Sequence, residues 1–72
     1  MTTEYAATLG SRVREKRMAA GISLRELARR TDISPSYLSS VELGENEPTA
    51  SKIQRIAKEL HIAIDKLLPK QA

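Results

Sequence analysis

Two kinds of side chain that could bind a ligand gather between positions 23 and 41: hydroxyls, which donate or accept hydrogen bonds, and guanidinium groups, which bind anions. The residues are Ser23, Ser34, Ser36, Ser39 and Ser40, with Arg25, Arg29 and Arg30. Catalysis is not indicated, because these serines have no general base at a recognisable spacing and the chain has no cysteine and one histidine, His61. The sequence has no glycine-rich phosphate loop or cluster of metal ligands, so it predicts a binding protein without a cofactor, not an enzyme.

The element that positions these side chains is a pair of short helices joined by a tight turn. Ser23 stands where a helix N-cap is expected, and Glu26 follows three residues later, which is the spacing of a reciprocal capping box. Ser34 repeats the start signal and Pro35 follows at the first helical position. Two capped helices, 24–30 and 35–42, separated by three or four residues, predict a helix-turn-helix with Ile33 in the core.

Apolar residues at three- and four-residue steps predict further helices on both sides of this pair. A first helix at about 5–20 ends at Gly21, a fourth at about 50–60 begins after Thr49, and a fifth at about 64–68 stops before Pro69. The prediction is one compact all-α domain over residues 1–72 with five helices.

A helical-wheel count separates the two sides of the 35–42 helix. With Leu38 at the centre of the buried side, the outward side carries Ser36, Ser39, Ser40 and Leu43, which are small and nearly uncharged and allow close approach to another surface. Glu42 lies at the edge of the buried side, and Arg17 ends the buried stripe of the first helix. An unpaired charge there is costly, so we expect Arg17 and Glu42 to form a structural ion pair.

Composition limits the class of partner. The chain has 72 residues, a net charge of +3 and a pI of about 9.6, which favours an anionic partner, although a solvated basic surface explains the same numbers. No apolar run approaches the ~20 residues needed to cross a bilayer. The N-terminus lacks the pattern of a secretory signal, so we expect a cytoplasmic protein, bacterial or phage-encoded.

Four motifs in order and spacing carry a family resemblance that extends from about Leu9 to Leu68. They are LGSRVREKR, GISLRELA, ISPSYLSSVELG and PTASKIQRIAKEL. The chain resembles the five-helix DNA-binding domain of phage repressors and Cro proteins, the XRE-type helix-turn-helix family. The resemblance implies a transcriptional regulator, expected to be a repressor, that binds an inverted-repeat operator in double-stranded DNA as a homodimer.

The resemblance also assigns roles to residues, with the 35–42 helix as the recognition helix in the major groove. Base reading is expected from Pro35, Ser36, Ser39 and Ser40, and DNA backbone contacts from Ser23, Arg25, Tyr37 and Asn46. Three features depart from the family pattern: Leu24 replaces the usual Gln, Glu45 and Glu47 flank Asn46, and the reading side lacks Arg, Asn and Gln, which make bidentate base contacts. Specificity should therefore depend on water, DNA shape and dimer spacing.

The sequence does not settle which residues form a dimer interface or whether the main ligand is DNA or a protein. Some of His61, Ile64, Leu67 and Leu68 could face a partner subunit, because the core needs only part of the last two helices. The alternative function is a protein-interaction adaptor or antitoxin-like module of the same fold, which the apolar and acidic residues Leu43, Glu45 and Glu47 favour.

Overall fold

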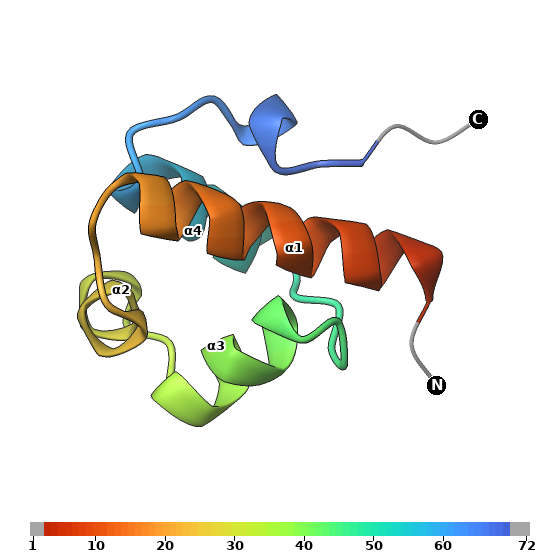
Figure 1. The fold of residues 1–72 in the computed structure, drawn as a ribbon, viewed down its shortest axis with the longest axis horizontal. Helices are drawn as coiled ribbons and strands as arrows, with labels where there is room; N and C mark the ends of the chain where they lie inside the picture. The colour runs from red at the N-terminus through yellow and green to blue at the C-terminus, as the bar shows by residue number, and fades with distance from the viewer. Residues whose placement is uncertain (1–2, 70–72) are drawn as a thin grey trace.

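A computed structural model describes residues 3–69 as four α-helices and one short 3₁₀ helix, with no strand among them (Figure 1). The helices are α1 (Glu4–Ala19), α2 (Leu24–Thr31), α3 (Pro35–Glu42), α4 (Ala50–Glu59) and the 3₁₀ helix η1 (Ile64–Lys66). The all-helical class is confirmed, but the predicted count of five helices is not, because only four of them are α-helices. The segment at 64–68 forms only a single 3₁₀ turn, because so short a run before Pro69 cannot repay helix nucleation.

Each α-helix begins with a hydroxyl side chain that accepts a hydrogen bond from a backbone N–H of the first turn. The caps are Thr3, Ser23, Ser34 and Thr49, with oxygen-to-nitrogen distances of 3.0, 3.0, 3.1 and 3.4 Å. Thr3 starts α1 one residue earlier than the sequence pattern predicts. Because each N-cap is set by a single residue and its neighbours, the N-terminal boundaries of these helices can be predicted from the sequence to within about a residue.

Each α-helix ends in a left-handed residue followed by the double hydrogen bond of a Schellman motif. After α4, for example, the His61 N–H donates to Lys58 O at 3.1 Å and the Ile62 N–H donates to Ala57 O at 3.0 Å. The left-handed residues are Gly21 (φ 70°), Asp32 (φ 58°), Gly44 (φ 79°) and His61 (φ 58°). Two of the four helix ends are therefore made by residues with a Cβ, in a conformation that costs free energy.

His61→Gly should raise the melting temperature, because glycine adopts φ 58° without the steric cost that histidine carries. The expected gain is up to ~1 kcal/mol, since the greater chain entropy of glycine in the unfolded state offsets part of the relief. Thermal unfolding followed by circular dichroism measures it. His61→Ala is the matched control, because it removes the imidazole but keeps the Cβ. An equal gain in both variants would assign the effect to the imidazole and contradict the backbone explanation.

The core lies where α1, α2, α3 and α4 meet, with the C-terminal segment closing one side (Figure 1). Its most deeply buried side chains are aliphatic, at 0–1% exposure: Leu9, Val13, Leu27, Leu38, Val41, Ile56 and Leu67. Ile33, in the turn between α2 and α3, is 6% exposed and belongs to the same core, as predicted. That turn residue joins α2 and α3 to the core and so fixes the orientation of α3.

The contact between α1 and α3 depends on Gly10, which is buried in the middle of α1. A Cβ added to Gly10 would lie 2.1 Å from the carbonyl oxygen of Val41 and 2.9 Å from that of Glu42. Backbone atoms cannot swing aside as a side chain can, so only glycine permits this approach. The absence of a Cβ at Gly10 therefore allows the close distance between α1 and α3.

Candidate nucleic-acid interface

The outward side of α3 presents small side chains to solvent. Pro35 and Ser36 are exposed, Ser39 and Ser40 are half-buried, and Leu43 is 64% exposed. The Ser40 hydroxyl donates to the carbonyl oxygen of Ser36 at 3.0 Å. That bond uses the only hydrogen of the hydroxyl. While it persists, Ser40 can accept a hydrogen bond from a ligand but cannot donate one. A ligand group facing Ser40 should therefore be a donor.

The N-terminus of α2 lies beside α3. Ser23 accepts from the Glu26 N–H at 3.0 Å, so its own hydrogen remains free to donate, and Arg25 is exposed two residues later. Leu24 is half-buried and lines a small hollow together with Ser39 of α3 and Leu43, the residue that follows α3. The structure thus brings the predicted backbone contacts of α2 to one flank of the serine side.

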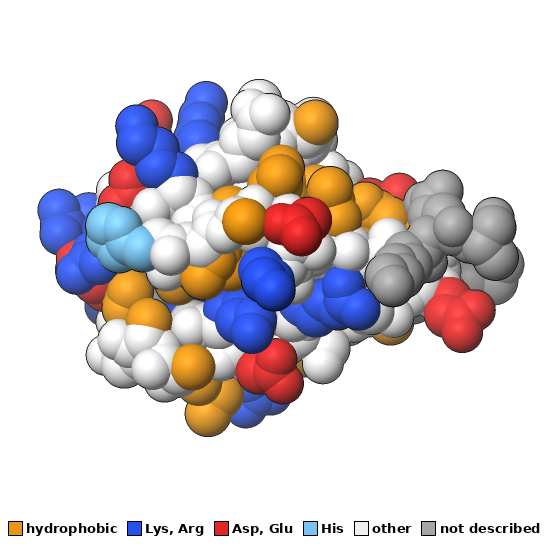
Figure 2. Space-filling model, turned by 90° about the horizontal axis from the view of Figure 1, so that it is seen from above, with side chains coloured by type: hydrophobic (Ala, Val, Ile, Leu, Met, Phe, Trp, Pro, Cys, Tyr) orange, Lys and Arg blue, Asp and Glu red, His pale blue; other side chains and the backbone are white. Residues whose placement is uncertain are grey.

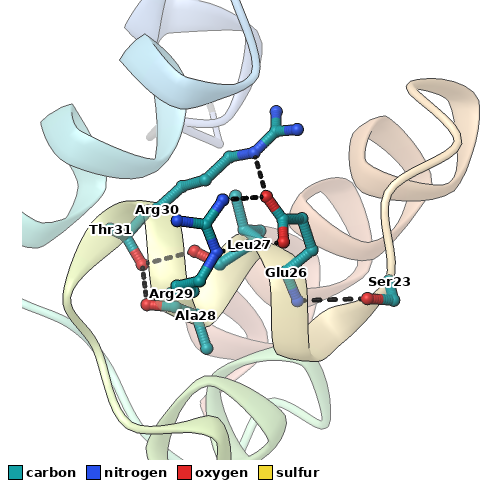
Figure 3. A network of polar contacts seen from close by, with 7 residues as sticks. All are labelled: Ser23, Glu26, Leu27, Ala28, Arg29, Arg30 and Thr31. Carbon is teal, nitrogen blue, oxygen red and sulfur yellow. Dashed lines mark hydrogen bonds and ion pairs between the residues drawn. The ribbon is translucent and has the colours of Figure 1, made fainter.

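Glu26 is bound by two arginines of its own helix (Figure 3). Arg29 Nε donates to Glu26 Oε1 at 3.1 Å, and Arg30 Nε donates to Glu26 Oε2 at 2.7 Å. The capping box expected from the sequence is therefore only half formed. Ser23 caps α2, but the Glu26 carboxylate is bound by Arg29 and Arg30 and not by the Ser23 N–H. Hydrogen bonds from Arg29 and then Arg30 lower the pKa of Glu26 from 4.5 to about 2.

A buried ion pair ties α1 to the end of α3. Arg17 Nε lies 2.7 Å from Glu42 Oε2, and a second guanidinium nitrogen lies 3.0 Å from Oε1. The third donates to the carbonyl oxygen of Ile22 at 2.9 Å, in the segment that leads to α2. Their side chains are 13% and 6% exposed, and the hydrogen bond that Arg17 donates to Glu42 raises the pKa of Arg17. These are the two residues that the sequence predicts to pair, and the pair joins three segments around α3.

The loop after α3 carries two acidic side chains, Glu45 and Glu47, and Glu47 is bound by a residue outside the loop. Glu45, Asn46 and Glu47 are exposed, and Pro48 behind them is buried. Glu47 is held by the hydroxyl of Thr3, which donates to Glu47 Oε1 at 2.6 Å. This bond joins the loop to the start of α1 and satisfies one of the two carboxylates that flank Asn46.

A family model described as helix-turn-helix matches residues 13–67. The chain belongs to this family, the XRE-type helix-turn-helix domains. Its helix-turn-helix consists of α2, the turn at Asp32–Ile33 and α3. The matched segment includes all four motifs quoted from the sequence except residues 9–12, the first four residues of LGSRVREKR.

Known relatives of this helix-turn-helix chain are described as transcriptional regulators. It is 41% identical over 58 residues to an uncharacterized HTH-type transcriptional regulator of Mycobacterium tuberculosis, an alignment that covers 81% of this chain and 41% of that protein. SinR of Bacillus subtilis is 31% identical over 61 residues, covering 83% of this chain and 55% of SinR. The chain thus spans about two fifths to about half the length of these relatives.

Solved helix-turn-helix structures have the same fold. The restriction-modification controller protein C.AhdI from Aeromonas hydrophila superposes with a TM-score of 0.85 at 32% identity, over 88% of this chain and 96% of that one. SinR, the master regulator for biofilm formation, crystallised in complex with DNA, superposes with a TM-score of 0.79 at 30% identity, over 82% of this chain and 95% of that one.

The residues expected at a dimer interface do not share one environment. Leu67 is fully buried in the helix-turn-helix core, so the expectation that it could face a partner is wrong, and Arg12 fixes this segment by donating to the carbonyl oxygen of Leu68 at 2.8 Å. His61 is exposed at the end of α4. Ile64 and Leu68 are half-buried and line an open groove with Tyr5 and Ile53. The face seen in Figure 2 carries clustered hydrophobic side chains bordered by Lys and Arg.

Residues 3–69 provide neither a membrane-spanning helix nor a metal site. None of the helices there has the length and apolar character to cross a bilayer. The same stretch contains no group of three or more His, Asp and Glu side chains placed to hold a metal ion.

Glu26 should titrate far below an ordinary glutamate. Its pKa in the folded protein is about 2, against 4.5 for an unperturbed group, so its ion pairs should stabilise the fold fully above about pH 4.5 and progressively less as the pH falls towards 2. The carboxyl ¹³C shift of Glu26, followed by NMR against pH, measures this midpoint. Arg30→Gln should move the midpoint upward. A midpoint near 4.5 in the unmodified protein would mean that Arg29 and Arg30 do not hold Glu26 in solution.

Proposed function

We propose that this chain is a sequence-specific DNA-binding transcriptional regulator, bacterial or phage-encoded and expected to be a repressor, and that α3 enters the major groove of an inverted-repeat operator. The observation that carries the proposal is the small, uncharged and exposed side of α3, held by a helix-turn-helix in which α2 presents Ser23 and Arg25 beside it. A helix fits within a groove about 12 Å wide, and the absence of carboxylates on that side avoids repulsion by the DNA phosphates. We expect such a regulator to act in the cytoplasm, where bacterial DNA lies.

The roles within the interface follow from exposure and chemistry. Pro35 and Ser36 would meet base edges, with Ser39 and Ser40 at the margins of the same side. Ser23, Arg25, Tyr37 and Asn46 would contact sugar and phosphate, and a helix N-terminus with free N–H groups suits that purpose. Serine hydroxyls discriminate weakly between bases, so shape and spacing would supply much of the specificity.

Two copies would be needed to reach a useful site length, because one recognition helix reads only a few base pairs. In a two-fold dimer the recognition helices would lie about 34 Å apart, one DNA turn. Ile64 and Leu68 are the residues of the proposed dimer surface that remain accessible and apolar, with His61 at its edge. Analytical ultracentrifugation tests this point. A monomer both free and on operator DNA would remove the dimer proposal.

The experiment that tests the function is selection of bound duplexes from a random pool. The expected product is an inverted repeat with half-site centres about ten base pairs apart. Duplex affinity should also fall by orders of magnitude between ~50 and ~200 mM salt if several phosphates are contacted. Ser36→Ala should change the selected sequence while the free energy of unfolding stays within ~0.5 kcal/mol of wild type. Enrichment of no sequence, together with no duplex binding at low salt, would reject the proposal.

A second candidate, a protein-interaction adaptor or antitoxin-like module of the same fold, is favoured by one observation: Leu43 stays 64% exposed at the end of α3. An exposed leucine beside the half-buried Ser39 suits a protein partner as well as a DNA sugar edge. Salt dependence separates the two functions, because an adaptor should show no measurable duplex binding at physiological salt.

A further inference from the structure

A helix in the major groove has a phosphate wall on each side, so α3 has two flanks that need a partner on the DNA. Counted at about 100° per residue from Leu38, Ser39 and Tyr37 lie about a quarter turn to opposite sides. The Ser39 flank adjoins the N-terminus of α2, because Ser39 and Leu24 line the same hollow. The backbone contacts expected from the sequence therefore leave the Tyr37 flank with no cation.

Lys52 of α4 supplies a cation on that flank. Its Nζ lies 4.3 Å from the centroid of the Tyr37 ring, well within the range in which an ammonium is attracted to an aromatic face. Both side chains are half-buried, and Lys52 forms no ion pair with any carboxylate that the structure describes. The ammonium is thus fixed beside the recognition helix with its charge uncompensated.

The position of Lys52 within α4 is unfavourable for the helix itself. It is the third residue after the cap Thr49, where Glu or Gln completes a capping box and where the helix dipole favours an anion. No acidic residue stands in that first turn. Lys52 therefore does little to stabilise α4, and among the residues that the structure describes its ammonium has the ring of Tyr37 as a partner but no carboxylate.

We infer that Lys52, held by the ring of Tyr37, contacts a phosphate of the DNA strand that lines this flank of α3. The inference rests on the proposed function and adds to it a backbone contact opposite the one made by α2. Lys52 would touch the phosphate. The hydroxyl of Tyr37 would make the backbone contact proposed above, while its ring acts as a positioning group that restricts the lysine side chain before DNA arrives. Restricting a flexible side chain in advance lowers the ordering cost of binding.

The salt dependence of duplex binding tests the contact with Lys52→Met, which keeps the length of the aliphatic stem and removes the charge. The probe is a fluorescein-labelled mixed-sequence DNA duplex roughly two helical turns long, titrated by anisotropy from ~50 to ~200 mM salt. Loss of one phosphate contact should reduce the slope of log K against log salt by about 0.9. The affinity advantage of wild type over Lys52→Met should then shrink about 3.5-fold across that range.

Lys58→Met is the matched control, because it removes the same charge from the same helix. Lys58 is exposed six residues further on, ~9 Å along the axis and about a third of a turn around it. Its slope should equal that of wild type, and Lys52→Arg should restore the wild-type slope. Circular dichroism melts establish that the variants are folded under the conditions of the titration.

Tyr37 is tested by comparing Tyr37→Leu with Tyr37→Phe, which keeps the ring and loses only the hydroxyl. Tyr37→Leu should weaken duplex binding several-fold relative to Tyr37→Phe at ~50 mM salt while leaving the salt slope unchanged, because the phosphate contact can still form at a higher ordering cost. In the Lys52→Met background the two Tyr37 variants should bind equally. A purely structural role for Tyr37 would give the same loss in both backgrounds.

Each outcome separates this inference from the proposed function. Steep salt dependence in wild type with an unchanged slope in Lys52→Met would overturn the Lys52 contact and leave the regulator proposal standing. Equal losses of slope in Lys52→Met and Lys58→Met would show that the change in net charge alone causes the loss, and would also overturn the Lys52 contact. Failure of wild type to bind the duplex at ~50 mM salt would reject both.

Discussion

Replacing Gly10 with alanine should destabilise the protein by about 3 kcal/mol or more, against the intrinsic preference of an α-helix, which favours alanine over glycine by about 1 kcal/mol. The reason is the 2.1 Å between the added Cβ and the carbonyl oxygen of Val41. Relief requires α1 and α3 to separate, which opens the core around Leu9 and Val13 and adds the cost of overpacking. For a domain of this size that loss lowers the melting temperature by on the order of 15 °C.

Thermal or urea unfolding measures the effect, and Ser11→Ala is the matched control. Ser11 is the next residue of the same helix and is exposed, so its replacement adds no contact and should stabilise slightly by propensity alone. A Gly10→Ala variant that melts with Ser11→Ala or above it would mean that the close approach of α1 and α3 does not hold in solution. Because α3 would be displaced, weaker duplex binding should accompany the loss of stability.

Replacing Glu42 with alanine should cost about 3 kcal/mol, because Arg17 would keep its charge in a site where its side chain is only 13% exposed. The carbonyl oxygen of Ile22 would remain as its one partner in the hydrogen-bond network described above. Loss of a partner from a buried pair costs more than the pair itself contributes, since the remaining charge is left desolvated. Urea unfolding measures the change at constant pH and salt.

A control and a double variant separate this mechanism from a loss of packing. Glu45→Ala removes an exposed carboxylate three residues away and should stay within ~0.5 kcal/mol of wild type. Arg17→Met combined with Glu42→Leu should be more stable than Glu42→Ala, because no buried charge remains unpaired. Equal stability of Glu42→Ala and wild type would show that the pair contributes nothing to folding.

Features encoded within a few residues were predictable from the sequence. The hydroxyl caps, the left-handed glycines at Gly21 and Gly44 and the apolar spacing are local, and they place the four α-helices to within a residue or two. The burial of Ile33 and the approach of Arg17 to Glu42 also follow from the pattern, because each residue type has few favourable environments at its position. The roles proposed for Pro35, Ser36, Ser39 and Ser40 come from the family resemblance and stay predictions.

Competition between partners was not predictable in the same way. Glu26 was expected to bind the Ser23 N–H, but Arg29 and Arg30 lie one turn further along the same helix and offer charged donors, which bind a carboxylate more strongly than a neutral amide does. Leu67 shows the same limit for apolar residues. Its spacing with Ile64 and Leu68 suits an exposed stripe, and only the path of the chain after α4 turns it into the core.

The sequence by itself determined that this chain is an all-α helix-turn-helix protein with a small, uncharged side on its third helix, because capping and periodicity act over three to five residues. It did not show that the segment after α4 forms a 3₁₀ turn and not a fifth α-helix. Only the tertiary structure decided how closely α3 packs against α1 and which side chain lies against Tyr37. The glycine contact between α1 and α3 and the stack of Lys52 on Tyr37 join residues 15 or more positions apart. Such contacts depend on where whole helices meet, and no local pattern encodes that distance.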